Sequence, residues 1–221
     1  MPKTEDQRPQ TGKVAAIILA AGQSTRMGAF KPLLPFGSQT VIESCIQYLR
    51  DGGVETVIVV VGQNPRAEKL KAELRDSQIT IAVNPDPASE MSASISYGVR
   101  NLPAQTHAVL ITPVDHPAVA SQVVTVLVNE WEKGARLVMP TWKDRGGHPV
   151  LVDLSFRDEL LSLDSGRGLK GLFDAHPADV RRIPVGSNYI ARDMDTWDDY
   201  RALHKEVFGV FPPKQPLLAQ N

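Results

Sequence analysis

The chain has 221 residues, and its 24 Lys and Arg against 25 Asp and Glu leave a formal net charge of −1. This near-balance provides no overall field for nucleic acid or an anionic membrane surface, so an anionic ligand must be held by local cations. A single cysteine, Cys45, excludes an intramolecular disulfide and a cysteine-rich metal site, and the absence of a long apolar stretch or an apolar leader predicts a cytoplasmic protein without membrane contact.

Polar, proline-containing segments lie at both ends of the sequence. Residues 1–12 and 209–221 lack a periodic apolar pattern and are predicted to be flexible tails. Residues 13–208 contain no linker and no repeat. They are therefore predicted to form a single domain, which is long enough to bury a core.

Within that domain, short aliphatic runs alternate with helical patterns. The runs expected to form buried strands are 14–19, 56–61, 79–83, 108–112 and 137–140, and the helices expected between them are 40–51, 65–75, 91–101 and 120–133. Thr40 with Glu43 forms a capping-box pattern, and Asn64 before Pro65 is typical of a helix start. This alternation predicts a right-handed, mainly parallel α/β sheet, whose ligands bind beyond the carboxyl ends of the strands.

The alternation breaks after residue 140. Residues 145–147 suggest a turn into a strand at 148–152, followed by helices near 154–162 and 169–176 and a strand at 180–185. A final helix at 196–207 closes the domain. We expect the residues after 140 to form one wall of a binding site for a second ligand.

The most informative segment is residues 19–31, Leu-Ala-Ala-Gly-Gln-Ser-Thr-Arg-Met-Gly-Ala-Phe-Lys, directly behind the first strand. Gly22 and Gly28 allow backbone amides to turn toward an anion. Arg26 supplies a fork of donors, Lys31 a mobile point charge and Ser24 a short donor. The alternative is a tight turn with solvated surface charges. The preceding strand and the ordered cations favour phosphate binding.

This loop lacks the Gly-Lys-Ser/Thr of a P-loop and the three glycines of a dinucleotide fingerprint. Its Leu-Ala-Ala-Gly opening, Arg26-Met27-Gly28 and the run Lys-Pro-Leu-Leu at 31–34 closely resemble the signature loop of the molybdenum cofactor cytidylyltransferases, members of the MobA-like nucleotidyltransferases. The resemblance implies a three-layer, Rossmann-like nucleotidyltransferase fold. It also implies Mg²⁺-dependent transfer of CMP from CTP to the phosphate of molybdopterin cofactor, with release of pyrophosphate. The nucleotide-binding residues that it implies are Leu19, Ala20, Ala21, Gly22, Ser24, Arg26, Lys31 and Asn84.

Asp115 follows the strand at 108–112, at the edge where the phosphate loop is expected. A carboxylate there is well placed for Mg²⁺, although an Asp next to a proline is also typical of a turn. In the family a Gly-Asp-Gln-Pro segment stands here and its Asp binds the metal. This chain keeps Asp115 and Pro117 but has Val114 and His116 in place of the glycine and glutamine.

The second carboxylate cluster surrounds Asp195. Related nucleotidyltransferases carry Asp-x-Asp-Thr-Pro-x-Asp, whose second Asp faces the metal, so the resemblance assigns Asp195 as the second metal ligand; Trp197 replaces the proline. The alternative is helix capping by Asp195 or Thr196, which is compatible with metal binding. Asp193 is a weaker candidate for orienting a cation or a water.

The acceptor-binding residues are assigned on looser matches. Ser92 and Ser94 lie in a stretch comparable to the family's Gly-Met-Ser-x-Ser, with Glu90 in place of the glycine. His148 lies in Gly-His-Pro-Val, which resembles a strand of the molybdopterin cytidylyltransferases, although a histidine beside glycines is more often structural. Residues 165–170 match the family only loosely.

The predicted catalytic residues are Arg26, Lys31 and Asp115. Four alternatives stay open: guanylyl transfer from GTP to the same cofactor, transfer to a sugar phosphate, transfer to a phospho-alcohol, and a nucleotide-sensing maturation partner without turnover. Guanylyl enzymes usually show Leu-Ala-Gly-Gly, so Ala20-Ala21 favours CTP. Transient contact with a molybdoenzyme is a further expectation.

Overall fold

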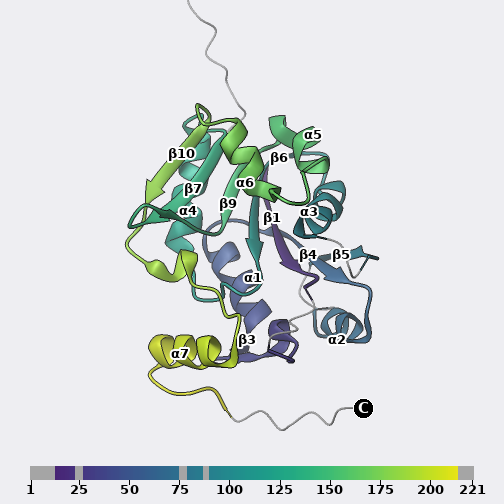
Figure 1. Ribbon diagram of the computed structural model, residues 1–221, viewed down its shortest axis with the longest axis vertical. Coiled ribbons are helices and arrows are strands. Elements are labelled where there is room, and N and C mark those ends of the chain that lie inside the picture. Colours follow the sequence, from purple (N-terminus) through teal and green to yellow (C-terminus); the bar gives the residue numbers. More distant parts are fainter. Residues whose placement is uncertain (1–12, 23–26, 75–78, 87–89, 214–221) are drawn as a thin grey trace, which may run out of the picture.

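The computed structural model describes residues 13–22, 27–74, 79–86 and 90–213. At its centre is an eight-stranded sheet with the order β10-β7-β9-β6-β1-β4-β5, in which β8 pairs with β7 (Figure 1). Its strands are β1 (Lys13–Ala20), β4 (Thr56–Gly62), β5 (Thr80–Asn84), β6 (Thr106–Pro113), β7 (Leu137–Trp142), β8 (Arg145–Gly146), β9 (Val150–Asp153) and β10 (Val180–Pro184). A separate two-stranded sheet joins β2 (Pro35–Phe36) to β3 (Gln39–Thr40).

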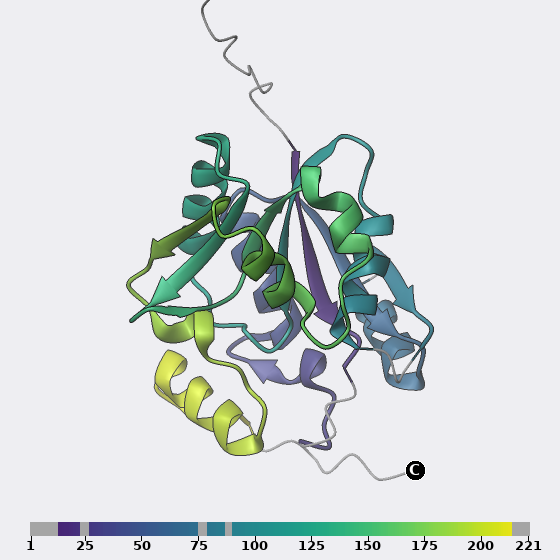
Figure 2. The ribbon, with the colours of Figure 1, turned by 45° about the horizontal axis from the view of Figure 1, so that its top comes forward.

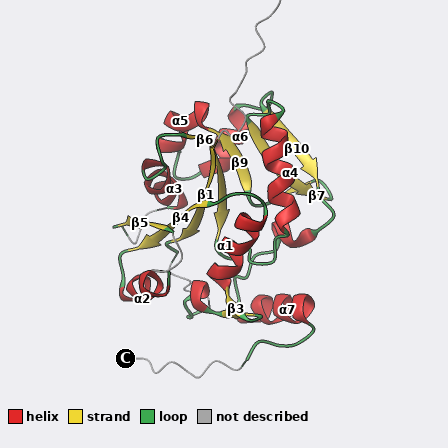
Figure 3. Ribbon diagram, turned by 180° about the vertical axis from the view of Figure 1, so that it is seen from behind, coloured by secondary structure: helices red, strands yellow, loops and turns green. Residues whose placement is uncertain are grey.

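Helices cover both faces of the sheet. One core packs α1 (Val41–Asp51), α2 (Pro65–Glu73) and α4 (Ser121–Glu132) on one face, while α3 (Met91–Arg100), α5 (Arg157–Leu161) and α6 (Gly168–Ala175) pack on the other. Figure 3 shows α1 and α4 in front of the strands, and Figure 2 shows the opposite face with α6. Successive residues of β1 alternate between the two cores, as a strand buried on both faces requires. The three-layer, mainly parallel α/β fold is therefore confirmed.

Local chemistry explains where several helices begin. Thr40 caps α1 in a complete capping box with Glu43, and Asn64 accepts the backbone N–H of Ala67 at the start of α2. The helix expected at 154–162 is instead divided into a 3-10 turn, Leu154–Phe156, and α5. Asp153 caps the 3-10 turn, and this local cap competes with one continuous α-helix.

The strand register aligns the ends of the parallel strands. Ala20 of β1 lies opposite Val61 of β4, and Gly62 lies opposite Asn84 of β5. On the other side of β1, Leu19 lies opposite Pro113 of β6. The loops that follow β1, β4, β5 and β6 therefore leave the sheet at one edge, hereafter the carboxyl edge.

β9 departs from simple strand and helix alternation. It lies between β6 and β7 and runs antiparallel to both, with Val150 opposite Ile111. The start of β9, rather than its end, consequently lies at the carboxyl edge. β8 forms a hairpin with β7 through Lys143 and Asp144, both at positive φ. The turn expected at 145–147 therefore lies two residues earlier than predicted: Arg145–Gly146 forms β8, and the strand expected at 148–152 is β9, Val150–Asp153.

The last helix, α7 (Trp197–Phe208), lies below the sheet beside β3 in Figure 1. It ends at Gly209, whose φ of 75° suits a residue without a Cβ. Beyond it, the ring of Phe211 lies 5.2 Å from the Arg201 guanidinium and 4.8 Å from the Lys205 ammonium. The assignment of the two tails and of a single domain stays a prediction. Within the described ranges, none of the helices has the length and apolar character needed to cross a bilayer.

Candidate active site

The first loop begins where β1 ends. The side chains of Leu19 and Ala20 are buried in opposite cores, so only their backbone could contact a nucleotide. Gly22 is exposed, and no atom of the described residues lies within 4 Å of the place that a Cβ would take. The predicted phosphate ligands Ser24 and Arg26 lie outside the described residues.

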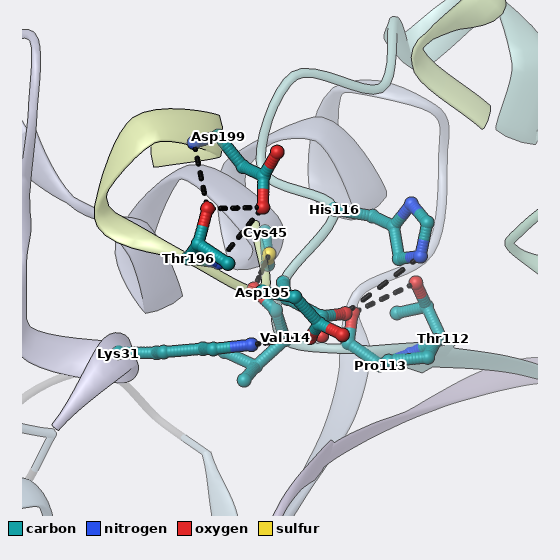
Figure 4. Close-up of polar contacts among 10 residues, drawn as sticks. Lys31, Cys45, Thr112, Pro113, Val114, His116, Asp195, Thr196 and Asp199 are labelled. Carbon is teal, nitrogen blue, oxygen red and sulfur yellow. Dashed lines mark hydrogen bonds and ion pairs between the residues drawn. The ribbon is translucent and has the colours of Figure 1, made fainter. Parts of the chain in front are cut away.

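Lys31 lies at the start of a 3-10 turn, Lys31–Leu33, and its side chain is only 9% exposed. Its ammonium lies 2.9 Å from Asp195 Oδ1 and 3.4 Å from Asp115 Oδ2 (Figure 4). These three residues come from the first loop, the loop after β6 and the segment before α7. The structure thus brings together one predicted phosphate ligand and both predicted metal ligands, which lie 84 and 164 residues from Lys31 in the sequence.

The carboxylates of Asp115 and Asp195 share the ammonium of Lys31, and their combined negative charge suits a metal cation. Asp115 Oδ1 is buried and accepts no hydrogen bond from the described residues; the nearest imidazole nitrogen, His116 Nε2, is 3.7 Å away. In the described part of the chain, no three His, Cys, Asp or Glu residues are grouped to hold a metal. Mg²⁺ is usually held by one or two carboxylates, with substrate phosphates and water completing its ligands. Asp115 and Asp195 fit that arrangement.

Helix capping and cation binding are divided between neighbouring residues in the segment before α7. Thr196 is the N-cap: its hydroxyl accepts the Asp199 N–H at 3.2 Å, and the Asp199 carboxylate accepts the Thr196 N–H at 2.8 Å. Asp195 does not cap the helix, and its carboxylate faces Lys31 instead (Figure 4). Asp193 is exposed, two residues earlier.

His148 lies at the same edge because β9 begins there. Its backbone N–H donates to Ile190 O at 2.7 Å, and its ring lies 5.4 Å from the His116 ring, centroid to centroid. Burial lowers the pKa of His148 to about 4, and the charge of a protonated His116 acts in the same direction. His148 is therefore neutral at pH 7. Through the contact between its ring and that of His116, His148 links the start of β9 to the loop that carries Asp115.

Asn84, Ser92 and Ser94 form a different environment. The Asn84 amide donates to the Ser94 hydroxyl at 2.9 Å, while its Oδ1 accepts the Asp86 N–H at 3.1 Å. Ser92 is buried in the first turn of α3. Asn84 lies at the carboxyl edge, but these hydrogen bonds give it a structural role in joining the end of β5 to α3. The nucleotide and acceptor roles of the three residues stay predictions.

Sequence reasoning missed the contacts beneath the Asp115 loop. Cys45 and Tyr48 of α1 donate hydrogen bonds to Val114 O and to the Thr112 hydroxyl. Cys45 is fully buried, and this burial raises the pKa of its thiol strongly. The helical pattern of α1 could place both residues on its buried face, but it carried no signal for their partners.

Comparison with known proteins identifies the family of the chain. The sequence profile described as the MobA-like NTP transferase domain matches residues 16–180, more than half of the chain. "Nicotine blue oxidoreductase" of Paenarthrobacter nicotinovorans is 29% identical over 200 residues, which cover 86% of this chain and 96% of that protein. "Molybdenum cofactor cytidylyltransferase" of Escherichia coli K12 is 31% identical over 187 residues, covering 85% and 93%.

One further relative and one solved structure are also similar to this chain. "Probable molybdenum cofactor guanylyltransferase" of Mycobacterium avium is 25% identical over 197 residues, covering 86% of this chain and 95% of that protein. Among solved structures, Rv0371c from Mycobacterium tuberculosis superimposes with a TM-score of 0.78 at 25% identity, covering 87% of this chain and 98% of that one.

Proposed function

The chain belongs to the MobA-like NTP transferase family and is a nucleotidyltransferase; from that premise we propose that it transfers CMP from CTP to the phosphate of molybdopterin cofactor and releases pyrophosphate. The observation that carries the proposal is the convergence of Lys31, Asp115 and Asp195 at the carboxyl edge. This is the edge where α/β sheets bind ligands.

Asp115 and Asp195 would hold a divalent metal ion, for which we propose Mg²⁺. Bound there, the ion would supply positive charge that offsets the charge developing on the nucleotide phosphates. Lys31 would contribute a second cation, and Arg26 a third on the same loop. The low exposure of Lys31 matters, because a cation shielded from water interacts more strongly with phosphate oxygens.

The acceptor phosphate is itself the nucleophile. It is ionised at neutral pH, so the reaction needs positioning and charge neutralisation more than a general base. A phosphate oxygen of the acceptor attacks the α-phosphorus of CTP, and the bond to the β,γ-diphosphate breaks as pyrophosphate leaves. We assign His148, at the start of β9, and more weakly Ser92 and Ser94, to the acceptor side.

The preference for CTP over GTP rests on the Ala20-Ala21 pair and on the relative named as a cytidylyltransferase at 31% identity. GTP is the nearest alternative, because a relative named as a probable guanylyltransferase matches at 25%. Transfer to a sugar phosphate or a phospho-alcohol is the next alternative.

A second candidate, oxidation or reduction of nicotine blue, comes from the relative named "Nicotine blue oxidoreductase" at 29% identity. An oxidation or reduction does not require two carboxylates gathered around a lysine, whereas transfer between phosphates needs both cation sites. The site therefore favours nucleotidyl transfer.

A panel of reactions tests these assignments. Each of the four nucleoside triphosphates is incubated with Mg²⁺ and molybdopterin cofactor, a sugar phosphate or a phospho-alcohol, and pyrophosphate release is followed. We expect release with CTP and molybdopterin cofactor. Release only with GTP, or only with another acceptor, would overturn the corresponding assignment. Oxidation or reduction of nicotine blue without any pyrophosphate release would favour the second candidate.

A further inference from the structure

The loop that carries Asp115 rests on helix α1 through side-chain hydrogen bonds. The Tyr48 hydroxyl donates to Thr112 Oγ1 at 3.1 Å, and the Thr112 hydroxyl donates to Pro113 O at 3.2 Å. The Cys45 thiol donates to Val114 O at 3.4 Å (Figure 4). These bonds bind the three residues that immediately precede Asp115.

The end of β6 needs such support because its pairing with β9 stops early. The register with β9 ends at Ile111 opposite Val150, whereas β6 continues against β1 as far as Pro113. The Val114 N–H donates to Leu19 O at 3.1 Å. Carbonyls beyond the last pair need other donors, and the Cys45 thiol and the Thr112 hydroxyl supply them to Val114 O and Pro113 O.

The Asp115 carboxylate has little else to orient it. Its Oδ1 accepts no hydrogen bond from the described residues, and its Oδ2 is 3.4 Å from the end of the long Lys31 side chain. Its position therefore depends mainly on its backbone. Tyr48, Cys45 and Thr112 are all buried, so the network that holds this backbone is shielded from water.

Both α1 donors keep their protons. Burial raises the pKa of Tyr48 and of Cys45, and the nearby charge of Asp115 acts in the same direction on both. The hydroxyl and the thiol consequently remain donors throughout the physiological pH range.

We propose that Tyr48, Thr112 and Cys45 are positioning residues that hold Asp115 in the position at which it binds a divalent cation. The inference rests on the proposed function, since it takes Asp115 as a metal ligand. Partners that orient a metal ligand without touching the metal commonly change metal affinity by about tenfold or more when removed.

Binding of Mn²⁺ to the full chain without nucleotide, followed by the electron paramagnetic resonance signal of the free ion, tests the proposal. Tyr48→Phe and Thr112→Val should each weaken Mn²⁺ binding about tenfold. Thr112→Ser and Cys45→Ser keep a donor and should bind more tightly than Thr112→Val and Cys45→Ala. In turnover, KM for the metal–nucleotide should rise by more than kcat falls.

Trp131→Phe is the matched control. It removes a 2.7 Å hydrogen bond from the indole to Asp153, at the end of β9 away from the carboxyl edge. We expect it to lower thermal stability without changing Mn²⁺ affinity. Tyr48→Phe and Thr112→Val variants that lose stability like the control but bind Mn²⁺ like the parent chain would overturn the proposal. A parent chain that binds no Mn²⁺ would instead overturn the proposed metal site, and this inference with it.

Discussion

The two halves of the central sheet bring residues to the carboxyl edge by different means. In the half formed by β5, β4, β1 and β6, the strands are parallel and the loops that follow them reach the edge together. In the half formed by β9, β7 and β10, antiparallel β9 arrives with its start at the edge. The first half therefore collects residues that follow strands, such as Asp115, and the second contributes one that precedes a strand, His148.

The difference separates two tasks in the proposed reaction. The parallel half, with the segment before α7, gathers Lys31, Asp115 and Asp195, which we propose bind the nucleotide and its metal. The half around β9 would offer the partly buried imidazole of His148, neutral at pH 7, to the acceptor side. Substitutions in the two halves should consequently have different signatures.

Asp115→Asn should have the largest effect, because it removes a metal-binding charge from the parallel half while keeping the shape of the side chain. We expect kcat/KM for pyrophosphate release to fall by about a thousandfold. Asp198→Asn changes an exposed carboxylate in the first turn of α7 and should leave turnover within about twofold. A variant at Asp115 that retains a tenth of the parent activity would remove this residue from the metal site.

Lys31→Met should be the next most severe change. We expect turnover to fall a few hundredfold, on the order of 10²–10³, because a shielded cation is lost from the transition state. Mn²⁺ binding without nucleotide should become tighter, since Asp115 and Asp195 lose the ammonium that partly neutralises them. Lys133→Met, at a side chain that is 70% exposed, is the control for loss of a lysine. Weaker Mn²⁺ binding in the Lys31 variant would contradict the shared-cation geometry.

His148 should give the half around β9 its own pH signature. Its pKa in the folded chain is about 4, below its ordinary value of 6.5, so the unfolded chain binds this proton more readily. The free energy of unfolding should therefore be independent of this group above pH 6.5. As the pH falls from 6.5 towards 4, it should decrease by about 2–3 kcal/mol.

Denaturant titrations across this pH range measure that decrease. In His148→Gln the pH dependence should be reduced by the same amount, whereas His107→Gln, at an exposed histidine of β6, should retain it. An unchanged pH dependence of the free energy of unfolding in His148→Gln would show that His148 does not cause the decrease.

Gly147→Ala should have the smallest of these effects. An added Cβ would overlap the backbone carbonyl of Ile190, the same carbonyl that accepts the His148 N–H. We expect a loss of about 2 kcal/mol in stability and a rise in KM for the acceptor that exceeds the rise for CTP. Gly186→Ala is the matched control, because no atom in the described part of the chain lies within 4 Å of its added Cβ. Equal rises in both KM values would argue against separate tasks for the two halves.

The sequence was sufficient to predict most of the parallel half. Continuous aliphatic runs such as the one in β1 identify buried strands, and the capping residues Thr40 and Asn64 mark helix starts because their interactions are local. The signature loop and its family resemblance then led to Lys31, Asp115 and Asp195, which the structure gathers.

Non-local features could not be predicted in the same way. The direction of β9 depends on pairing with β6 and β7, and no residue within Val150–Asp153 specifies those partners. The contacts of Cys45 and Tyr48 with the Asp115 loop likewise join segments more than 60 residues apart. Periodicity reports which face of an element is buried, not what covers it.

The most direct test of the account follows the phosphorus atoms of CTP. CTP labelled at the α-phosphorus is incubated with the chain and molybdopterin cofactor, with Mg²⁺ or with a chelator, and the products are separated. We predict that the label enters the cofactor product only when Mg²⁺ is present, and that Asp115→Asn abolishes this incorporation. Incorporation that is unaffected by the chelator or by the substitution would contradict a metal-assisted transfer at Lys31, Asp115 and Asp195.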